Sequence, residues 1–95
     1  MPAPLRYVFR LYVTGRTPRS ERAIANLRRI CETVLPDRYE LSVVDVLEQP
    51  QLAEQERILA TPTLVKQIPL PARRVLGDLS DAEQVLWGLD VRADR

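Results

Sequence analysis

The sequence predicts a small α/β domain whose elements follow the order β-α-β-α-β-β-α. A strand–helix–strand pattern fills residues 6–47, and two further strands and a helix follow over residues 63–90. A helix of about five turns between two apolar strands favours a right-handed unit with parallel strands. The 95 residues suffice for one small hydrophobic core, so we expect a single domain over residues 1–95.

The first half of the chain has a consistent local pattern. Residues 6–13 are rich in aromatic and β-branched side chains, which is typical of a central strand, and residues 39–47 are predicted as a second strand. Thr17 before Pro18 predicts a helix start, because threonine caps the first turn and proline is tolerated at the first helical position. The apolar face of that helix consists of Ala23, Ile24, Leu27, Ile30, Cys31, Val34 and Leu35.

The second half is less uniform. Residues 50–59 predict a short polar helix with few apolar anchors, and residues 63–68 and 73–76 predict two short strands. Ser80, with Glu83 three residues later, forms the pattern of a capping box. This pattern predicts that the last helix begins at Ser80.

Composition excludes several classes of function. The chain has 14 basic and 13 acidic residues and a net charge of +1, which argues against nucleic-acid or membrane-surface binding. It has no histidine and a single cysteine, so we expect no histidine-based catalysis, metal site or internal disulfide. Residues 1–10 lack the pattern of a signal peptide, and no apolar run approaches the ~18 residues of a membrane span. We therefore expect a cytoplasmic protein without a cofactor.

The order of elements resembles the thioredoxin fold, and residues 60–64, Ala-Thr-Pro-Thr-Leu, resemble the loop that carries a cis-proline in that family. Thioredoxins place their catalytic CxxC just after the first strand, where this chain has residues 15–20 without sulfur. Cys31 is either a redox thiol or a small core residue, and its place on the apolar face favours the core. We expect no catalytic residue, which weighs against a thioredoxin-like reductase or peroxidase.

Three stretches are similar to KaiB circadian clock proteins: LYVTGRTPRSERAI, VVDVLEQPQLAEQERILATPTLVK and PLPARRVLGDLSDAEQVLWGLD. They cover nearly the whole chain, and the third is long and unusual enough to be specific. The KaiB family is also similar to the N-terminal sensory domain of the clock histidine kinase SasA. The chain is therefore identified as a member of the KaiB family.

The resemblance implies a non-enzymatic adaptor. KaiB proteins bind the N-terminal ATPase ring of the KaiC hexamer, help to sequester KaiA and compete with SasA, and so promote KaiC dephosphorylation. An alternative is a KaiB-like or SasA-like stress or signalling module that works without a clock. The resemblance also implies two folds: a homotetramer whose elements follow β-α-β-β-α-α-β, and a rarer thioredoxin-like monomer that binds KaiC. Residues 1–47 would be constant and residues 48–95 would switch.

Local preferences in the second half are consistent with such a switch. Pro69 and Pro71 disfavour both a helix and a central strand, because proline donates no backbone hydrogen bond. Gly88 costs roughly 1 kcal/mol in a helix, and Asp90 opposes the helix dipole by roughly 0.3–1 kcal/mol. The bonds before Pro62, Pro69 and Pro71 isomerise within tens to hundreds of seconds in general, which we expect to slow the rearrangement. The alternative interpretation is a frayed C-terminal helix.

The resemblance also suggests where partners bind. KaiA is expected at the edge strand 39–47, around Leu41 and Val43, unless subunit packing or charge blocks that edge. The residues expected to contact KaiC are Gln51, Leu52, Glu54, Glu56 and Arg57. The alternative is that this polar helix is simply a solvated surface. Arg22, Arg73 and Arg74 either contribute to an interface or only solvate exposed faces.

Overall fold

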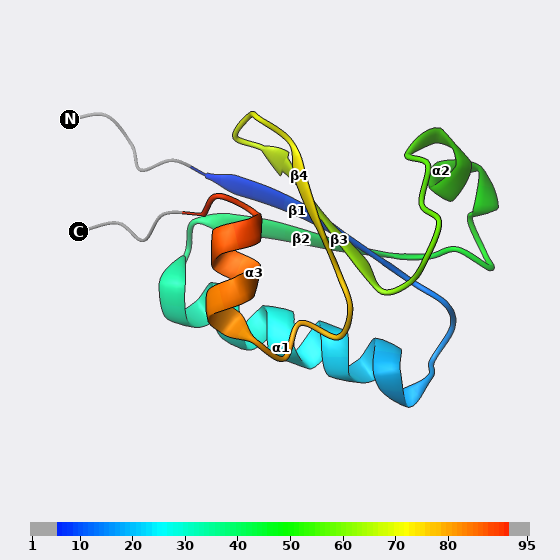
Figure 1. Ribbon diagram of the computed structural model, residues 1–95, viewed down its shortest axis with the longest axis horizontal. Coiled ribbons are helices and arrows are strands. Elements are labelled where there is room, and N and C mark those ends of the chain that lie inside the picture. Colours follow the sequence, from blue (N-terminus) through cyan, green and yellow to red (C-terminus); the bar gives the residue numbers. More distant parts are fainter. Residues whose placement is uncertain (1–5, 92–95) are drawn as a thin grey trace.

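The computed structural model describes residues 6–91 as a four-stranded sheet with two helices on one face and a short helix at one end (Figure 1). The elements are β1 (Tyr7–Val13), α1 (Pro18–Val34), β2 (Tyr39–Asp45), α2 (Pro50–Gln55), β3 (Thr63–Ile68), β4 (Arg73–Leu76) and α3 (Ala82–Gly88). The predicted order β-α-β-α-β-β-α is confirmed. Residues 1–5 and 92–95 lie outside the described part. The predictions for residues 1–10, which lack a signal-peptide pattern, and for a domain over residues 1–95 therefore fall partly on residues that the structure does not describe.

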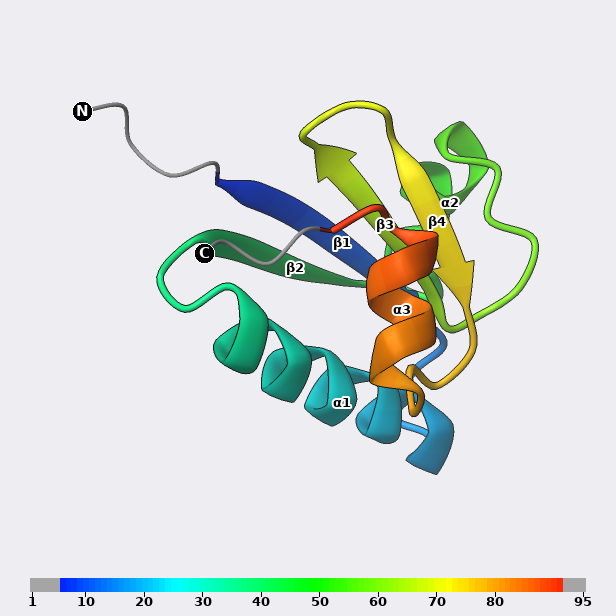
Figure 2. The same ribbon diagram turned by 60° about the vertical axis from the view of Figure 1, so that its left-hand side comes forward.

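The strands lie in the order β2-β1-β3-β4 (Figure 2). β1 pairs in parallel with β2 and antiparallel with β3, and β3 pairs antiparallel with β4. The prediction of a central first strand joined to a parallel second strand by a helix is therefore confirmed. β2 and β4 form the two edges of the sheet.

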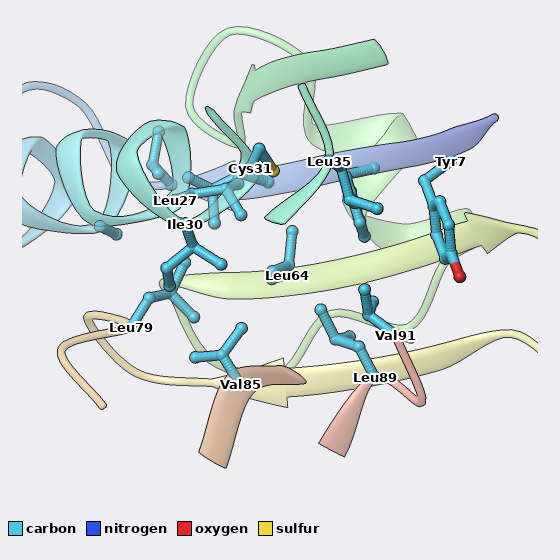
Figure 3. Close-up of a cluster of buried hydrophobic side chains, with 14 residues drawn as sticks. Tyr7, Leu27, Ile30, Cys31, Leu35, Leu64, Leu79, Val85, Leu89 and Val91 are labelled. Carbon is cyan, nitrogen blue, oxygen red and sulfur yellow. The ribbon is translucent and has the colours of Figure 1, made fainter. Parts of the chain in front are cut away.

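The main core lies between the sheet and the two helices α1 and α3 (Figure 3). The side chain of Thr17 accepts a hydrogen bond from the backbone N–H of Ser20 at 3.1 Å, so the predicted cap of α1 is confirmed. From α1, Leu27 and Cys31 point toward Leu64 of β3 and are almost fully buried. Burial of a leucine of this kind stabilises the fold by about 1.5–3 kcal/mol, so the apolar face of α1 fixes its position on the sheet.

The predicted second helix is too long, because it ends at Gln55 and does not reach residue 59. Arg57 has φ 55°, a left-handed conformation that reverses the chain. The N–H of Arg57 bonds the carbonyl of Glu54 at 3.1 Å, and the N–H of Ile58 bonds that of Ala53 at 2.9 Å. These two bonds form a Schellman turn, which terminates a helix.

The predicted ends of two other elements are also corrected. β2 stops at Asp45 and not at residue 47, because the Asp45 carboxylate accepts bonds from the N–H groups of Leu47 (2.9 Å) and Gly15 (3.1 Å). The cap of α3 is Asp81 and not Ser80: the Asp81 side chain accepts the N–H of Gln84 at 3.1 Å. Carboxylates that end a strand and start a helix by local hydrogen bonds thus displace both predicted boundaries.

Within residues 6–91, no helix has the combination of length and apolar character that a bilayer crossing requires.

Candidate partner-binding surfaces

The surface at α2 combines an apolar hollow with charged side chains. Its lining, which we call the α2 groove, consists of Val46, Pro50, Ala53, Glu54, Arg57, Ile58 and Leu59. α2 itself contains no buried residue, and the side chain of Leu59 is 97% exposed. An exposed apolar hollow beside charged groups is typical of a protein-binding site.

The residues predicted to contact KaiC occupy different positions around this helix. Glu54 and Arg57 line the α2 groove, and Gln51 is exposed beside them. Leu52 is half-buried and packs against a small cluster on the sheet, so it anchors the helix. Leu59, which was expected to be one of the few apolar anchors of this helix and not a contact residue, is almost fully exposed and lines the groove.

Glu56 does not line the groove and instead contacts Arg74 of β4. One guanidinium nitrogen of Arg74, Nη2, donates to the backbone carbonyl of Glu56 at 3.0 Å and lies 3.7 Å from the Glu56 carboxylate. The other, Nη1, donates to the carbonyl of Arg57 at 3.4 Å. Arg74 therefore forms intramolecular contacts, which neither sequence interpretation of this arginine considered.

A second arginine joins distant parts of the chain. Arg22 of α1 lies 3.6 Å from the carboxylate of Asp78, and Asn26 donates to the Asp78 backbone carbonyl at 2.8 Å. Hydrogen bonds from Ser80, together with the charge of Arg22, hold the pKa of Asp78 below its ordinary value. We call these contacts the Asp78 latch; they connect α1 to the loop before α3.

Arg73 points to the other side of β4 from Arg74, because side chains alternate along a strand. It lines a shallow hollow with Trp87, Gly88 and Asp90. The Trp87 side chain is 87% exposed, and sequence analysis did not identify it as a surface residue. The three arginines singled out from the sequence thus lie at three separate places.

β2 pairs only with β1 among the described residues, so its outer edge carries no strand partner there. Leu41 is half-buried under α1, and Val43 is 40% exposed. At the start of β2, the Tyr39 hydroxyl donates to Glu32 at 2.5 Å, and this bond, with a smaller effect of burial, raises the pKa of Tyr39 to about 12. The edge position predicted for residues 39–47 is confirmed for Tyr39–Asp45.

The position of the thioredoxin catalytic motif holds the turn before α1, which has no sulfur. Cys31 lies in the core and is 1% exposed, so its interpretation as a packing residue is confirmed. Burial, with a smaller effect of the neighbouring Glu32 charge, raises the pKa of the Cys31 thiol to about 12. This thiol is protonated at neutral pH, which is unsuitable for thiol–disulfide exchange.

The residues predicted to favour fold switching lie along the second half. Pro62, Pro69 and Pro71 each follow a cis peptide bond, as the thioredoxin-like loop predicted for Pro62. Gly88 is the last residue of α3, and Asp90 has φ 55° just beyond it. Their role in a fold change stays a prediction.

The KaiB domain family model matches residues 10–91. The chain belongs to the KaiB family. It is 56% identical over 86 residues to the circadian clock protein KaiB3 of Synechocystis sp., covering 90% of this chain and 84% of that relative. It is 59% identical over 85 residues to a circadian clock oscillator protein KaiB of Synechococcus sp., covering 90% and 77% respectively. These relatives support a role of this KaiB-family chain in a circadian clock.

Solved structures confirm the thioredoxin-like fold of this KaiB-family chain. The N-terminal domain of Synechococcus elongatus SasA is 29% identical, with a TM-score of 0.76 over 100% of this chain and 93% of that one. Mitochondrial thioredoxin 3 of Saccharomyces cerevisiae is 14% identical, with a TM-score of 0.71 over 90% and 78%. The second likeness concerns the fold alone.

Proposed function

We propose that this protein is a non-enzymatic clock adaptor that binds the N-terminal ATPase ring of the KaiC hexamer through the α2 groove and the polar residues beside it. The observation that carries the proposal is the α2 groove itself: an apolar hollow with an almost fully exposed Leu59, in a chain of the KaiB family. Glu54 and Arg57 at its rim supply opposite charges that orient a partner.

Two further partners follow from the same proposal. KaiA binds at the β2 edge, where backbone N–H and C=O groups accept an extended segment and Val43 adds apolar contact. SasA competes for KaiC because its N-terminal domain has the same fold as this chain, with a TM-score of 0.76. Retention of KaiA away from its activating site then promotes KaiC dephosphorylation.

The proposal includes the fold change. In this proposal, the thioredoxin-like fold belongs to a monomer that presents the α2 groove, and a homotetramer with a rearranged second half is the inactive form. Residues 48–95 carry the rearrangement, because their local preferences conflict at Pro69, Pro71, Gly88 and Asp90. The two states then need to differ by only a few kcal/mol.

The alternative is a KaiB-like or SasA-like stress or signalling module that works without a clock, since the chain shares the fold of the N-terminal domain of SasA. The two functions differ in their partner. An adaptor of KaiC binds the isolated hexamer, whereas a module of another pathway leaves that hexamer unbound under every nucleotide condition.

Gel filtration of the full chain with a KaiC hexamer and ATP tests the proposal. We expect co-elution with the hexamer, which Leu59→Ser in the α2 groove weakens about tenfold, since it removes apolar contact area. Leu70→Ser is a matched control, because Leu70 is 81% exposed and lies in the β3–β4 connection, away from α2. Absence of co-elution with any nucleotide contradicts the proposal.

A further inference from the structure

We propose that Arg74 is a positioning residue, which holds the end of α2 in the shape that the α2 groove requires. This inference rests on the proposed function, because it assigns the contact to the same docking surface. Arg74 does not line the α2 groove. It acts on the groove through its hydrogen bonds to the backbone carbonyls of Glu56 and Arg57.

The α2 helix has few other attachments to the rest of the molecule. It is six residues long, has no buried residue, and its N-cap Gln49 makes no side-chain hydrogen bond. The apolar contacts that tether this segment come from half-buried Leu52 and Ile58, which pack against Tyr12, Val44 and Val65. A helix held by so little apolar area depends on polar contacts for its orientation.

The Arg74 guanidinium supplies such a contact at the end where helix carbonyls remain without partners. α2 has no basic residue in its last turn, so the cation that favours a helix C-terminus comes from β4 instead. It donates to the carbonyls of Glu56 at 3.0 Å and Arg57 at 3.4 Å, and lies 3.7 Å from the Glu56 carboxylate. Two carbonyl acceptors and one carboxylate, on two consecutive residues, thus contact one side chain.

The chemistry of these contacts is specific for arginine. A planar guanidinium donates in two directions at once, whereas a lysine ammonium is a compact charge on a flexible stem. Arg57, whose carbonyl Arg74 binds, is also the left-handed residue of the turn and lines the α2 groove. The Arg74 contact therefore connects β4 directly to the residue that shapes the groove.

Backbone hydrogen exchange of the free protein tests the contact. The amides of Glu56, Arg57 and Ile58 donate within the turn to the carbonyls of Leu52, Glu54 and Ala53. We expect Arg74→Ala to accelerate their exchange about fivefold. Arg74→Lys should give an intermediate value, because lysine keeps the positive charge but cannot donate to both carbonyls with one planar group. Arg73→Ala is the matched control: the same charge is removed from the same strand on its other side.

The affinity of the same variants for the KaiC hexamer tests the consequence. We expect the affinity to fall in the order wild type, Arg74→Lys, Arg74→Ala, and Arg73→Ala serves as the control for hydrogen exchange alone. Equal exchange in Arg74→Ala and Arg73→Ala overturns the proposal, and so does faster exchange in Arg74→Ala with unchanged affinity. If Arg74→Ala does not fold, Arg74→Lys makes the same comparison. If the wild type does not bind KaiC, the proposed function fails, while the exchange rates still report on the Arg74 contact.

Discussion

At the residue scale, the proposed balance between two folds depends most on Gly88 and Asp90 at the end of α3. By helix propensity and dipole alone, Gly88→Ala with Asp90→Arg favours the helical state by roughly 1–3 kcal/mol. However, a Cβ at position 88 lies 2.9 Å from Cγ2 of Val75, so Val75 must move. Asp90 also has φ 55°, a conformation that aspartate tolerates better than arginine.

We therefore expect the double variant to favour the thioredoxin-like monomer by only about 1 kcal/mol, a change of about fivefold in population. Gel filtration measures the monomer fraction, and the rate of KaiC binding measures the active state. Asp90→Arg alone is the comparison, since it leaves Val75 in place. An unchanged monomer fraction and binding rate in the double variant contradict this account.

The sequence predicted which side chains are buried better than it predicted which side chains contact each other. The burial of Cys31 follows from helical periodicity, because i and i+4 positions share a face. The contacts of Arg74 and Arg22 do not follow from any local pattern. Arg74 contacts Glu56, 18 residues away in the chain, and Arg22 contacts Asp78, 56 residues away. Long polar side chains find partners only after the sheet and helices are packed.

The Schellman turn at the end of α2 gives a prediction for an element boundary. Arg57 has φ 55°, which costs about 1–2 kcal/mol for a residue other than glycine. We expect Arg57→Gly to stabilise the folded chain by about 0.5–1 kcal/mol, after the extra backbone entropy of glycine is subtracted. Urea unfolding measures this, and Arg57→Ala is the control, because it removes the same charge without relieving the backbone. Equal midpoints for the two variants would show that the turn is unstrained.

The Asp78 latch joins α1 to the loop before α3, and its contribution depends on pH. The pKa of Asp78 is lowered in the folded chain, so its ionised form stabilises the fold above the ordinary aspartate pKa, and this stabilisation disappears as the pH falls through the lowered value. We expect Asp78→Asn to lower the urea midpoint at pH 7 in low salt, with a smaller effect in 1 M salt.

At strongly acidic pH the two proteins should unfold at the same urea concentration, because Asp78 is then protonated. Glu48→Gln is a control: Glu48 is exposed, lies in the loop between β2 and α2, and no ion pair is found for it in the described residues. A midpoint difference for Asp78→Asn that persists at acidic pH would mean that the carboxylate charge is not the cause.

At the scale of elements, sequence periodicity predicted every helix and strand but misplaced several of their ends. The helix predicted over residues 50–59 stops early because the turn at Arg57 outweighs the weak helical preference that follows. Asp45 and Asp81 end β2 and begin α3 through side-chain bonds to nearby N–H groups. Such bonds compete with helix and strand ladders, and several residues near each boundary are able to form them.

For the whole molecule, the α2 groove illustrates how much of the candidate site can be predicted from the sequence. The polar character of α2 and the positions of Glu54 and Arg57 were predicted from the sequence, and both residues line the groove. The groove itself also requires Val46 and Leu59, which flank α2 and become its neighbours only when the chain turns back. A hollow made by several short segments depends on packing, which local patterns do not describe.

The central claim is that residues 48–95 have two packings of similar stability, of which only the thioredoxin-like one binds KaiC. NMR of the full chain, with backbone shifts and diffusion measured free and bound to the KaiC hexamer, tests it most directly. The account predicts a tetramer and a minor monomer in the free protein, and helical shifts for Ala82–Gly88 in the monomer and the bound form. One monomeric set of signals that KaiC and nucleotide leave unchanged would contradict it.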